Sequence, residues 1–344
     1  MNRLDRLRAS LEESLLVTTP VNVRYLTGFE STNAALLVEP ESARLFADFR
    51  YAEAGRKVQR VEFVEVERAL IRGVAGHVDG RIGFEPGHLT YANWELLRNA
   101  GLELVPRTGV VERLRAVKSD EELDLIRKAS EIANEAYVRL AEEPFVGRTE
   151  RDVAYRFDQL LHELGADGPS FPTTVASGPN GAVPHAHSAS RVIERGETVV
   201  VDAGAVVDGY ASDCTRTFAT GSLPDELAHA YDVVLEAQLA GLDAVEPGVT
   251  GRDADAAARG VIDGAGFGER FGHGLGHGVG LLVHEAPTLR PESEDTLVEN
   301  NVVTVEPGIY LPGVGGIRIE DLVVVRDGAP IVLTSFPKEL VTVD

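Results

Sequence analysis

Short apolar runs and amphipathic segments alternate over the first third of the chain. Apolar runs that predict buried strands lie at 14–18, 34–38 and 81–84. Apolar residues at helical spacing predict helices over 2–13, 50–58 and 91–100. The alternation of the two patterns predicts a small α/β domain.

A helix-capping signal marks the start of a long helix in the second third of the chain. Ser119 is followed three positions later by Glu122, which is the capping-box pattern. Apolar residues then recur at helical spacing as far as Leu140. We therefore place a domain boundary near residue 115, which divides the chain into domains 1–115 and 116–344.

The second domain contains an internal repeat. The motif Gly147-Arg148-Thr149-Glu150-Arg151-Asp152 recurs as Gly248-Val249-Thr250-Gly251-Arg252-Asp253, and in both copies the Thr can cap a helix. Each predicted helix runs to a Gly-Ala pair, Gly165-Ala166 in one copy and Gly264-Ala265 in the other. A His-bearing segment and a β-branched strand that ends in an acid follow in both copies. This succession predicts two structurally related halves.

The strand of the first copy ends in Asp202, and Asp213 follows a turn. With a turn at 207–208 the two residues lie directly opposite each other in a hairpin, and with Asp208-Gly209 as the turn they are diagonal on the same face. Neighbouring like charges are destabilising, so two carboxylates beside a run of valines favour a bound cation. The alternative is a pair of unrelated acids on a hydrated hairpin.

The second copy strengthens the metal interpretation. Glu306 and Glu320 lie in apolar, β-prone surroundings, where an unpaired charge is costly. Between the two carboxylate pairs, His273, His277 and His284 lie in a glycine-rich stretch, which allows close approach of the backbone to a site. Four carboxylates and one imidazole suit two metal ions about 3.5–4 Å apart. The sequence lacks the zincin, phosphate-loop, nucleophile-elbow and dinucleotide signatures.

The excess of acidic over basic residues argues against a nucleic-acid partner. The 344 residues include 33 Lys and Arg against 55 Asp and Glu, a net charge of -22, and residues 1–115 contribute none of this excess. Nucleic-acid binding requires a basic surface, so we expect no nucleic-acid partner and interpret the excess as a solvated acidic surface. A single cysteine, Cys214, excludes an internal disulfide. No signal peptide or membrane-spanning stretch is recognisable, so we expect a cytoplasmic protein without a membrane partner.

Several motifs together resemble those of the pita-bread metallopeptidases. They are Val201-Asp202-Ala203-Gly204, Tyr210-Ala211-Ser212-Asp213-Cys214-Thr215-Arg216-Thr217, Gly276-His277-Gly278-Val279-Gly280, His284-Glu285-Ala286-Pro287, Val305-Glu306-Pro307-Gly308 and Gly316-Ile317-Arg318-Ile319-Glu320-Asp321. The branch that they resemble is the Xaa-Pro peptidases, meaning aminopeptidase P and prolidase. Residues 22–29 and 48–51 are similar to the creatinase/prolidase N-terminal domain. The implied fold is α+β, with a C-terminal pita-bread domain of pseudo-twofold internal repeat after a smaller α/β creatinase-type domain.

The resemblance also implies roles for individual residues. The implied metal ligands are Asp202, Asp213, His277, Glu306 and Glu320. The implied catalytic residues are His185 and His284, which would face the substrate, and Glu306, which would move a proton. Tyr210 and Arg318 would lie beside the metals. The implied cofactor is two divalent ions, with Mn²⁺ preferred over Co²⁺, Zn²⁺ or Fe²⁺.

The implied activity is hydrolysis of the peptide bond between an N-terminal residue and proline, by a hydroxide that the two metals activate. The substrates would be small peptides with proline in the second position, and the protein would form a homodimer. Aminopeptidase and dipeptidase activity both stay open, because some prolidases carry an Arg where this chain has Thr288, and Arg290 is displaced. Alternatives are another hydrolase of the same fold, creatinase-like or acting on ectoine derivatives, a methionine aminopeptidase, and a metal-free binding protein.

Overall fold

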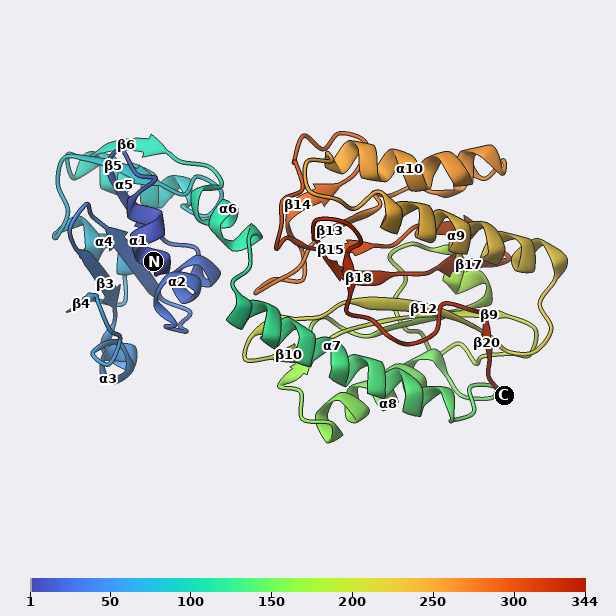
Figure 1. Ribbon diagram of the computed structural model, residues 1–344. Helices are drawn as coiled ribbons and strands as arrows, with labels where there is room; N and C mark the ends of the chain where they lie inside the picture. The colour runs from blue at the N-terminus through green and yellow to red at the C-terminus, as the bar shows by residue number, and fades with distance from the viewer. Residues whose placement is uncertain (1) are drawn as a thin grey trace. The chain divides into compact units, whose positions relative to one another are not determined.

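The computed structural model describes residues 2–344, which divide into two compact units, one ending at Arg115 and one running from Ala116 to Asp344 (Figure 1). The elements of the first unit are α1 (Arg3–Arg8), β1 (Ser14–Val17), α2 (Pro20–Thr27), β2 (Ala34–Val38), β3 (Ala43–Ala47), η1 (Phe49–Tyr51), α3 (Ala52–Gly55), β4 (Glu62–Glu65), α4 (Leu70–Ala75), β5 (Arg81–Phe84), α5 (Tyr91–Asn99), β6 (Glu103–Pro106) and α6 (Val110–Ala116).

The first unit is built on a six-stranded mixed sheet. Its strand order is β4-β3-β2-β1-β5-β6, with β1 antiparallel to β2 and parallel to β5. Buried side chains of the sheet, among them Leu16 and Phe46, form one hydrophobic core with Ile71 of α4 and Leu97 of α5. The α/β class predicted for this part of the chain is confirmed, and the three predicted strands correspond to β1, β2 and β5.

The helix predicted over 91–100 corresponds to α5, whereas the other two predicted helices of the first unit are longer than the observed ones. The helix predicted over 2–13 ends at Arg8, because the chain turns there to enter the sheet at Ser14. The segment 50–58 forms a 3-10 turn and one short helical turn instead of a continuous helix. The amphipathic pattern therefore located these helices but overestimated their extent, because turns and irregular segments occupy residues 9–13 and 56–58.

The second unit contains the remaining elements. They are α7 (Asp120–Ala141), α8 (Glu150–Glu163), β7 (Gly168–Pro169), β8 (Thr174–Ser177), η2 (Gly178–Ala182), β9 (Thr198–Ala203), β10 (Ala205–Val207), β11 (Tyr210–Ala211), β12 (Cys214–Ala219), α9 (Asp225–Asp243), α10 (Gly251–Gly264), η3 (Gly268–Arg270), β13 (Gly276–Gly278), β14 (Glu285–Leu289), β15 (Val302–Val305), β16 (Gly308–Leu311), β17 (Gly315–Arg318), β18 (Asp321–Val324), β19 (Ile331–Val332) and β20 (Val341–Thr342).

The second unit consists of two related halves. In the first half, α7 and α8 bury apolar residues against the sheet β20-β12-β9-β8. In the second half, α9 and α10 do the same against strands of the sheet β14-β13-β15-β18-β19. Figure 1 shows the strands lying between these two helix pairs. This arrangement confirms the predicted α+β fold with an internal repeat.

The repeat is visible at the level of single residues. The helices α8 and α10 both have 14 residues, and Thr149 and Thr250 cap them through the same hydrogen bond, each accepting from a backbone N–H three residues on. One detail of the predicted alignment is wrong. The glycine that matches Gly165 is Gly266, not Gly264, because both lie sixteen residues after the capping Thr and both have positive φ, 95° and 83°.

The hairpin that carries the first carboxylate pair uses Asp208-Gly209 as its turn. Both residues have positive φ, 48° and 79°, and Val207 pairs with Tyr210 across the turn. The register with a turn at 207–208 is therefore wrong. Asp202 lies opposite Thr215, so Asp202 and Asp213 are diagonal neighbours, as the second of the two registers predicts.

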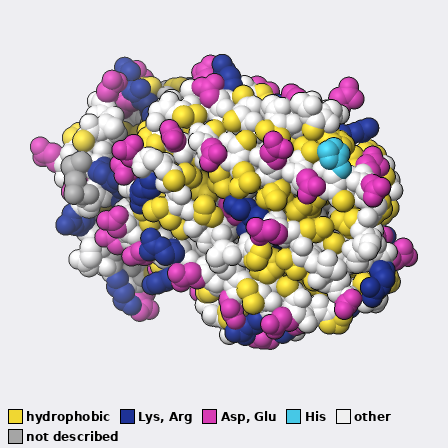
Figure 2. All heavy atoms as spheres, turned by 45° about the vertical axis from the view of Figure 1, so that its right-hand side comes forward, with side chains coloured by type: hydrophobic (Ala, Val, Ile, Leu, Met, Phe, Trp, Pro, Cys, Tyr) yellow, Lys and Arg dark blue, Asp and Glu magenta, His cyan; other side chains and the backbone are white. Residues whose placement is uncertain are grey.

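Over the residues that the structure describes, the face of the protein drawn in Figure 2 shows no acidic patch free of basic side chains. Figure 2 shows acidic side chains spread over the face turned toward the viewer, with basic side chains among them. Among residues 2–344, no helix combines the length and apolar character needed to cross a bilayer.

Candidate metal centre

The five predicted ligands come from strands, or the ends of strands, in both halves of the second unit. Asp202 lies in β9, Asp213 directly before β12, His277 in β13, Glu306 directly after β15, and Glu320 between β17 and β18. A backbone hydrogen bond joins the two halves at this point, from the N–H of Glu320 to the carbonyl oxygen of Thr215 (3.1 Å). The fold thus brings together residues that are up to 118 positions apart in the sequence.

Three of the carboxylates form a tight cluster. One oxygen from each of Asp202, Asp213 and Glu320 lies within 4.8 Å of the other two. Burial, together with the charges of neighbouring carboxylates, raises the pKa of Asp213 and Glu320 well above the usual range. One oxygen of Glu320, Oε1, is buried without a hydrogen-bond partner in the described part of the chain. Three buried carboxylates this close together are stable only with a positive charge between them. The oxygens of these three residues therefore fit a divalent cation.

His277 and Glu306 extend the cluster on one side. Nε2 of His277 lies 3.1 Å from Oε1 of Glu306 and 3.8 Å from Oδ2 of Asp213. Burial alone would raise the pKa of Glu306, but the hydrogen bond and charge of His277 lower it to about 2. Burial alone would lower the pKa of His277, but Glu306 raises it to about 9. Because one imidazole and four carboxylates meet here, the donor set fits two divalent ions.

A hydrogen-bond network fixes the carboxylates from behind. Arg318 donates from Nη2 to Asp202 (2.6 Å), from Nε to the hydroxyl of Thr215 (3.0 Å) and from Nη1 to the hydroxyl of Tyr310 (3.0 Å). Thr215 in turn donates to Oε2 of Glu320 (2.7 Å). His273 contacts the same Tyr310 hydroxyl through Nε2 (2.9 Å). Arg318 therefore contacts Asp202 directly and is linked to Glu320 through Thr215, and its role beside bound metals stays a prediction.

Two residues of this network, Thr215 and Tyr310, were not predicted as site residues from the sequence. Thr215 follows Asp213 by two positions in an extended segment, so its side chain falls on the same face, and this spacing could have indicated it. Nothing local marks Tyr310, whose hydroxyl reaches Arg318 only because β16 and β17 form a hairpin. Thr304, which was also missed, donates to Oε1 of Glu306 (3.0 Å).

The two histidines that would face the substrate are both exposed. The rings of His284 and His277 lie edge to face with their centroids 4.3 Å apart. His185 is near enough to both His284 and His273 for its charge to contribute to the lowering of their pKa, in which burial is the larger cause. His284 thus lies against the proposed ligand His277, and His185 lies near His284 and His273, while the substrate-facing role of both stays a prediction.

The other predicted neighbour of the metals, Tyr210, has a different observed contact. Its hydroxyl donates to Oε1 of Glu122 at the start of α7 (2.8 Å). This hydrogen bond ties the hairpin to the capping box of that helix. A role for Tyr210 beside the metals stays a prediction.

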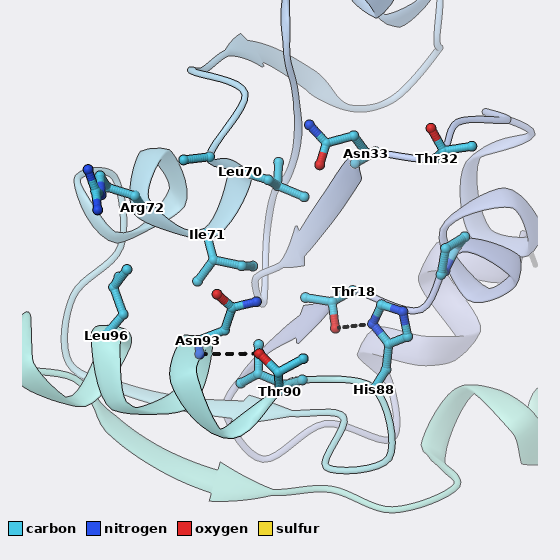
Figure 3. Close-up of a pocket in the computed structure, with 14 residues that line it drawn as sticks. Thr18, Thr32, Asn33, Leu70, Ile71, Arg72, His88, Thr90, Asn93 and Leu96 are labelled. Carbon is cyan, nitrogen blue, oxygen red and sulfur yellow. Dashed lines mark hydrogen bonds between the residues drawn. The ribbon is translucent and has the colours of Figure 1, made fainter.

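A separate cavity of about 520 Å³ lies in the first unit. It is lined by residues that follow β1, by the segment that leads into β2, by α4, and by α5 with the residues just before it. Figure 3 shows the hydrogen bond between His88 and Thr18 on its wall. No acidic side chain lines this cavity, so it offers none of the carboxylate ligands found in the second unit.

Comparison with known proteins defines the class of this chain. Residues 124–327 match the metallopeptidase family M24, and residues 3–117 match the creatinase/prolidase N-terminal domain. The protein is therefore an enzyme of the metallopeptidase class with a creatinase-type N-terminal domain.

Individual relatives match over almost the whole chain. The Xaa-Pro dipeptidase of Pyrococcus furiosus is 36% identical, over 98% of this chain and 99% of the relative. The structure of an Xaa-Pro dipeptidase from Bacillus anthracis has a TM-score of 0.95 at 38% identity, covering 99% of both chains. That of an X-Pro aminopeptidase from Thermotoga maritima has a TM-score of 0.90 at 32% identity, covering 99% of this chain and 100% of the other. The chain belongs to metallopeptidase family M24, and the resemblance found in its motifs is confirmed.

Proposed function

We propose that this protein hydrolyses the peptide bond between an N-terminal residue and proline, using two divalent metal ions. The observation that carries the proposal is the cluster of three carboxylates, whose oxygens lie within 4.8 Å of one another beside His277 and Glu306. The two solved structures and the Pyrococcus relative are called Xaa-Pro dipeptidases or an X-Pro aminopeptidase, which supports proline as the recognised residue.

The metal-holding residues would be Asp202, Asp213, His277, Glu306 and Glu320. Four carboxylates with a single imidazole form a donor set dominated by oxygen, which suits Mn²⁺, the ion that we propose. Bound at this site, divalent ions would supply a nucleophilic hydroxide at neutral pH and would stabilise negative charge in the transition state.

The protein's own groups would move the proton and orient the peptide. Glu306 would accept a proton at Oε2 while the hydroxyl of Thr304 donates to Oε1. His284, which is exposed and lies against His277, and His185, which is exposed and lies near His284, would each donate a ring N–H to the peptide carbonyl. Arg318 and Thr215 keep Asp202 and Glu320 in place during turnover.

Recognition of proline has a physical basis of its own. An amide that precedes proline has no N–H, and the ring restricts the backbone of the residue before it. A peptidase that binds the substrate through the N–H of the scissile amide loses this hydrogen bond when proline follows. A binding site specific for proline is therefore favoured.

The proposal is tested with metal-stripped protein and a small panel of substrates. After dialysis against a chelator we expect no cleavage of Ala-Pro or Ala-Pro-Ala, and we expect added Mn²⁺ to restore it. Comparing the two peptides separates dipeptidase from aminopeptidase activity, and Met-Ala-Ser and creatine serve as competing substrates. Full activity of the stripped protein, or turnover of creatine alone, would overturn the proposal.

A matched pair of variants links the activity to the cluster. Asp213→Asn removes a charge from the cluster and should abolish Xaa-Pro cleavage. Asp208→Asn makes the same change at the exposed turn of the same hairpin, where Asn tolerates the positive φ, and should leave activity unchanged. The homodimer and the cytoplasmic location stay predictions, and light scattering of the purified protein would test the first.

A further inference from the structure

Glu150 is a fully buried carboxylate, 0% exposed, at the first position of α8. It accepts four hydrogen bonds: Oε1 from the backbone N–H (2.7 Å) and hydroxyl (2.8 Å) of Ser177, and Oε2 from the side-chain amide of Asn180 (2.7 Å) and the backbone N–H of Ala189 (2.9 Å). A buried carboxylate is tolerated only where donors replace its lost hydration, and these four do so.

The donors enclose the segment that carries His185. Ser177 and Asn180 precede this histidine, and Ala189 follows it. Asn180 also donates to the carbonyl oxygen of His187 (3.2 Å), inside the segment. The backbone N–H of Glu150 donates to Arg191 (3.0 Å), beyond the far end. One side chain on α8 therefore holds both ends of a loop in which residues 183–185 are exposed.

A neighbouring cation supports this arrangement. Arg191 donates from Nη1 to the hydroxyl of Ser177 (2.7 Å), the same hydroxyl that donates to Glu150. The charge of Glu150 also contributes to the raised pKa of Arg191, after the larger contribution of the hydrogen bond to Glu197. Ser177 thus links the buried carboxylate to a charged partner, which lowers the cost of keeping it ionised.

Comparison of the two halves shows that helix capping does not require this carboxylate. The position equivalent to Glu150 in the second half is Gly251, and α10 is capped by Thr250 in the same way as α8 is by Thr149. A side chain at Gly251 would collide with the carbonyl oxygen of Thr288. The carboxylate is therefore a feature of the first half alone, the half that contains His185.

We propose that Glu150 is a positioning residue that fixes the loop of residues 178–189, so that His185 faces the substrate beside the metal ligands. The inference rests on the proposed function, because His185 is given a role only there. Glu150 does not touch the substrate and acts through the loop.

The first test is Glu150→Gln, in which an amide NH₂ replaces one oxygen and faces N–H donors. With Mn²⁺ loaded, we expect kcat for Ala-Pro-Ala to fall about 10- to 100-fold, as a misplacement of about 1 Å can cause, while metal content stays unchanged. Asn180→Ala is a milder variant that removes one donor and should give a smaller loss in kcat. Glu163→Gln, on the exposed part of the same helix, is the matched control and should match the wild type.

A double-mutant cycle with His185→Ala separates positioning from general destabilisation. If Glu150 acts through His185, Glu150→Gln should cause little further loss of kcat in the His185→Ala background. An equal fold-loss in both backgrounds would overturn the inference, and so would wild-type kcat in Glu150→Gln.

Hydrogen exchange provides a readout that needs no activity. We expect Glu150→Gln to accelerate amide exchange in residues 178–189 while the rest of α8 and β9 exchange as in the wild type. Unchanged exchange in this segment overturns the inference whether or not the enzyme is active. Accelerated exchange in a protein whose Mn²⁺-loaded wild type fails to cleave Xaa-Pro peptides would instead refute the proposed function and leave the fixing of the loop intact.

Discussion

The substitution Thr215→Val offers a direct test of how the carboxylate cluster is held. The hydroxyl of Thr215 is buried, donates to Oε2 of Glu320 (2.7 Å) and accepts from Nε of Arg318 (3.0 Å). Valine has nearly the same shape but neither hydrogen bond. Glu320, whose other oxygen already lacks a partner in the described structure, would then lose this donor as well.

The expected loss of metal affinity follows from the charge of Glu320, the group that accepts the hydrogen bond from Thr215. A hydrogen bond to a charged group contributes about 1.5–3 kcal/mol. If the lost bond had oriented Glu320 for metal binding, this corresponds to a decrease of about 10- to 100-fold in metal affinity, the range seen when supporting partners of metal ligands are removed. We expect this decrease in a titration of the metal-stripped variant with Mn²⁺, followed by calorimetry.

Thr217→Val is the matched control. Thr217 is the next same-face residue of β12, is equally buried, and exchanges hydrogen bonds with the backbone of Arg318 (2.9 and 3.0 Å). The same substitution there should lower the unfolding temperature but leave Mn²⁺ affinity within about twofold of the wild type. Equal affinities in wild type and Thr215→Val, or equal losses in both variants, would refute the reasoning.

Three further predictions concern the same unit. His284→Ala should retain both metals, measured by elemental analysis, and lose most turnover; loss of metal instead would contradict the ligand assignment. In the metal-free protein the raised pKa values of Asp213 and Glu320 mean that the native state holds extra protons, so their stabilising contribution is lost as the pH rises. The rise in unfolding temperature on adding Mn²⁺ should therefore be larger at about pH 8 than at about pH 5, and a smaller rise would contradict this. Lys118→Met breaks a buried ion pair with Glu285 (3.0 Å) and should cost about 3–5 kcal/mol in urea unfolding, with part of the loss recovered by adding Glu285→Gln.

Much of the fold was predictable because its signals are local. The capping residues Ser119, Thr149 and Thr250 begin the helices that the sequence predicts, and β-branched runs form the strands that end next to acids. A cap or a β-branched run acts over three to six residues, so its effect is read without knowing the rest of the chain. The family motifs added the implied identity of the five ligands.

The register of the first hairpin could not be decided in the same way. Both possible turns place Asp202 and Asp213 on one face, and the choice depends on the positive φ that Asp208 and Gly209 adopt once β9 and β12 pair. Two helices of the first unit were predicted too long, because the chain leaves the helix in a turn after Arg8 and after Gly55, and the apolar spacing does not mark where a helix ends.

The sequence by itself determined the caps, the strand-forming runs, the internal repeat and the kinds of side chain available for metal binding. Only the tertiary structure decided which of them meet: that Thr215 bridges Arg318 and Glu320, and that Glu150 holds both ends of the loop with His185. Such contacts join residues tens of positions apart, and their geometry depends on the packing of every element between them. The sequence contains the residues that form these hydrogen bonds. The distances between them are set only when the whole hydrophobic core has packed.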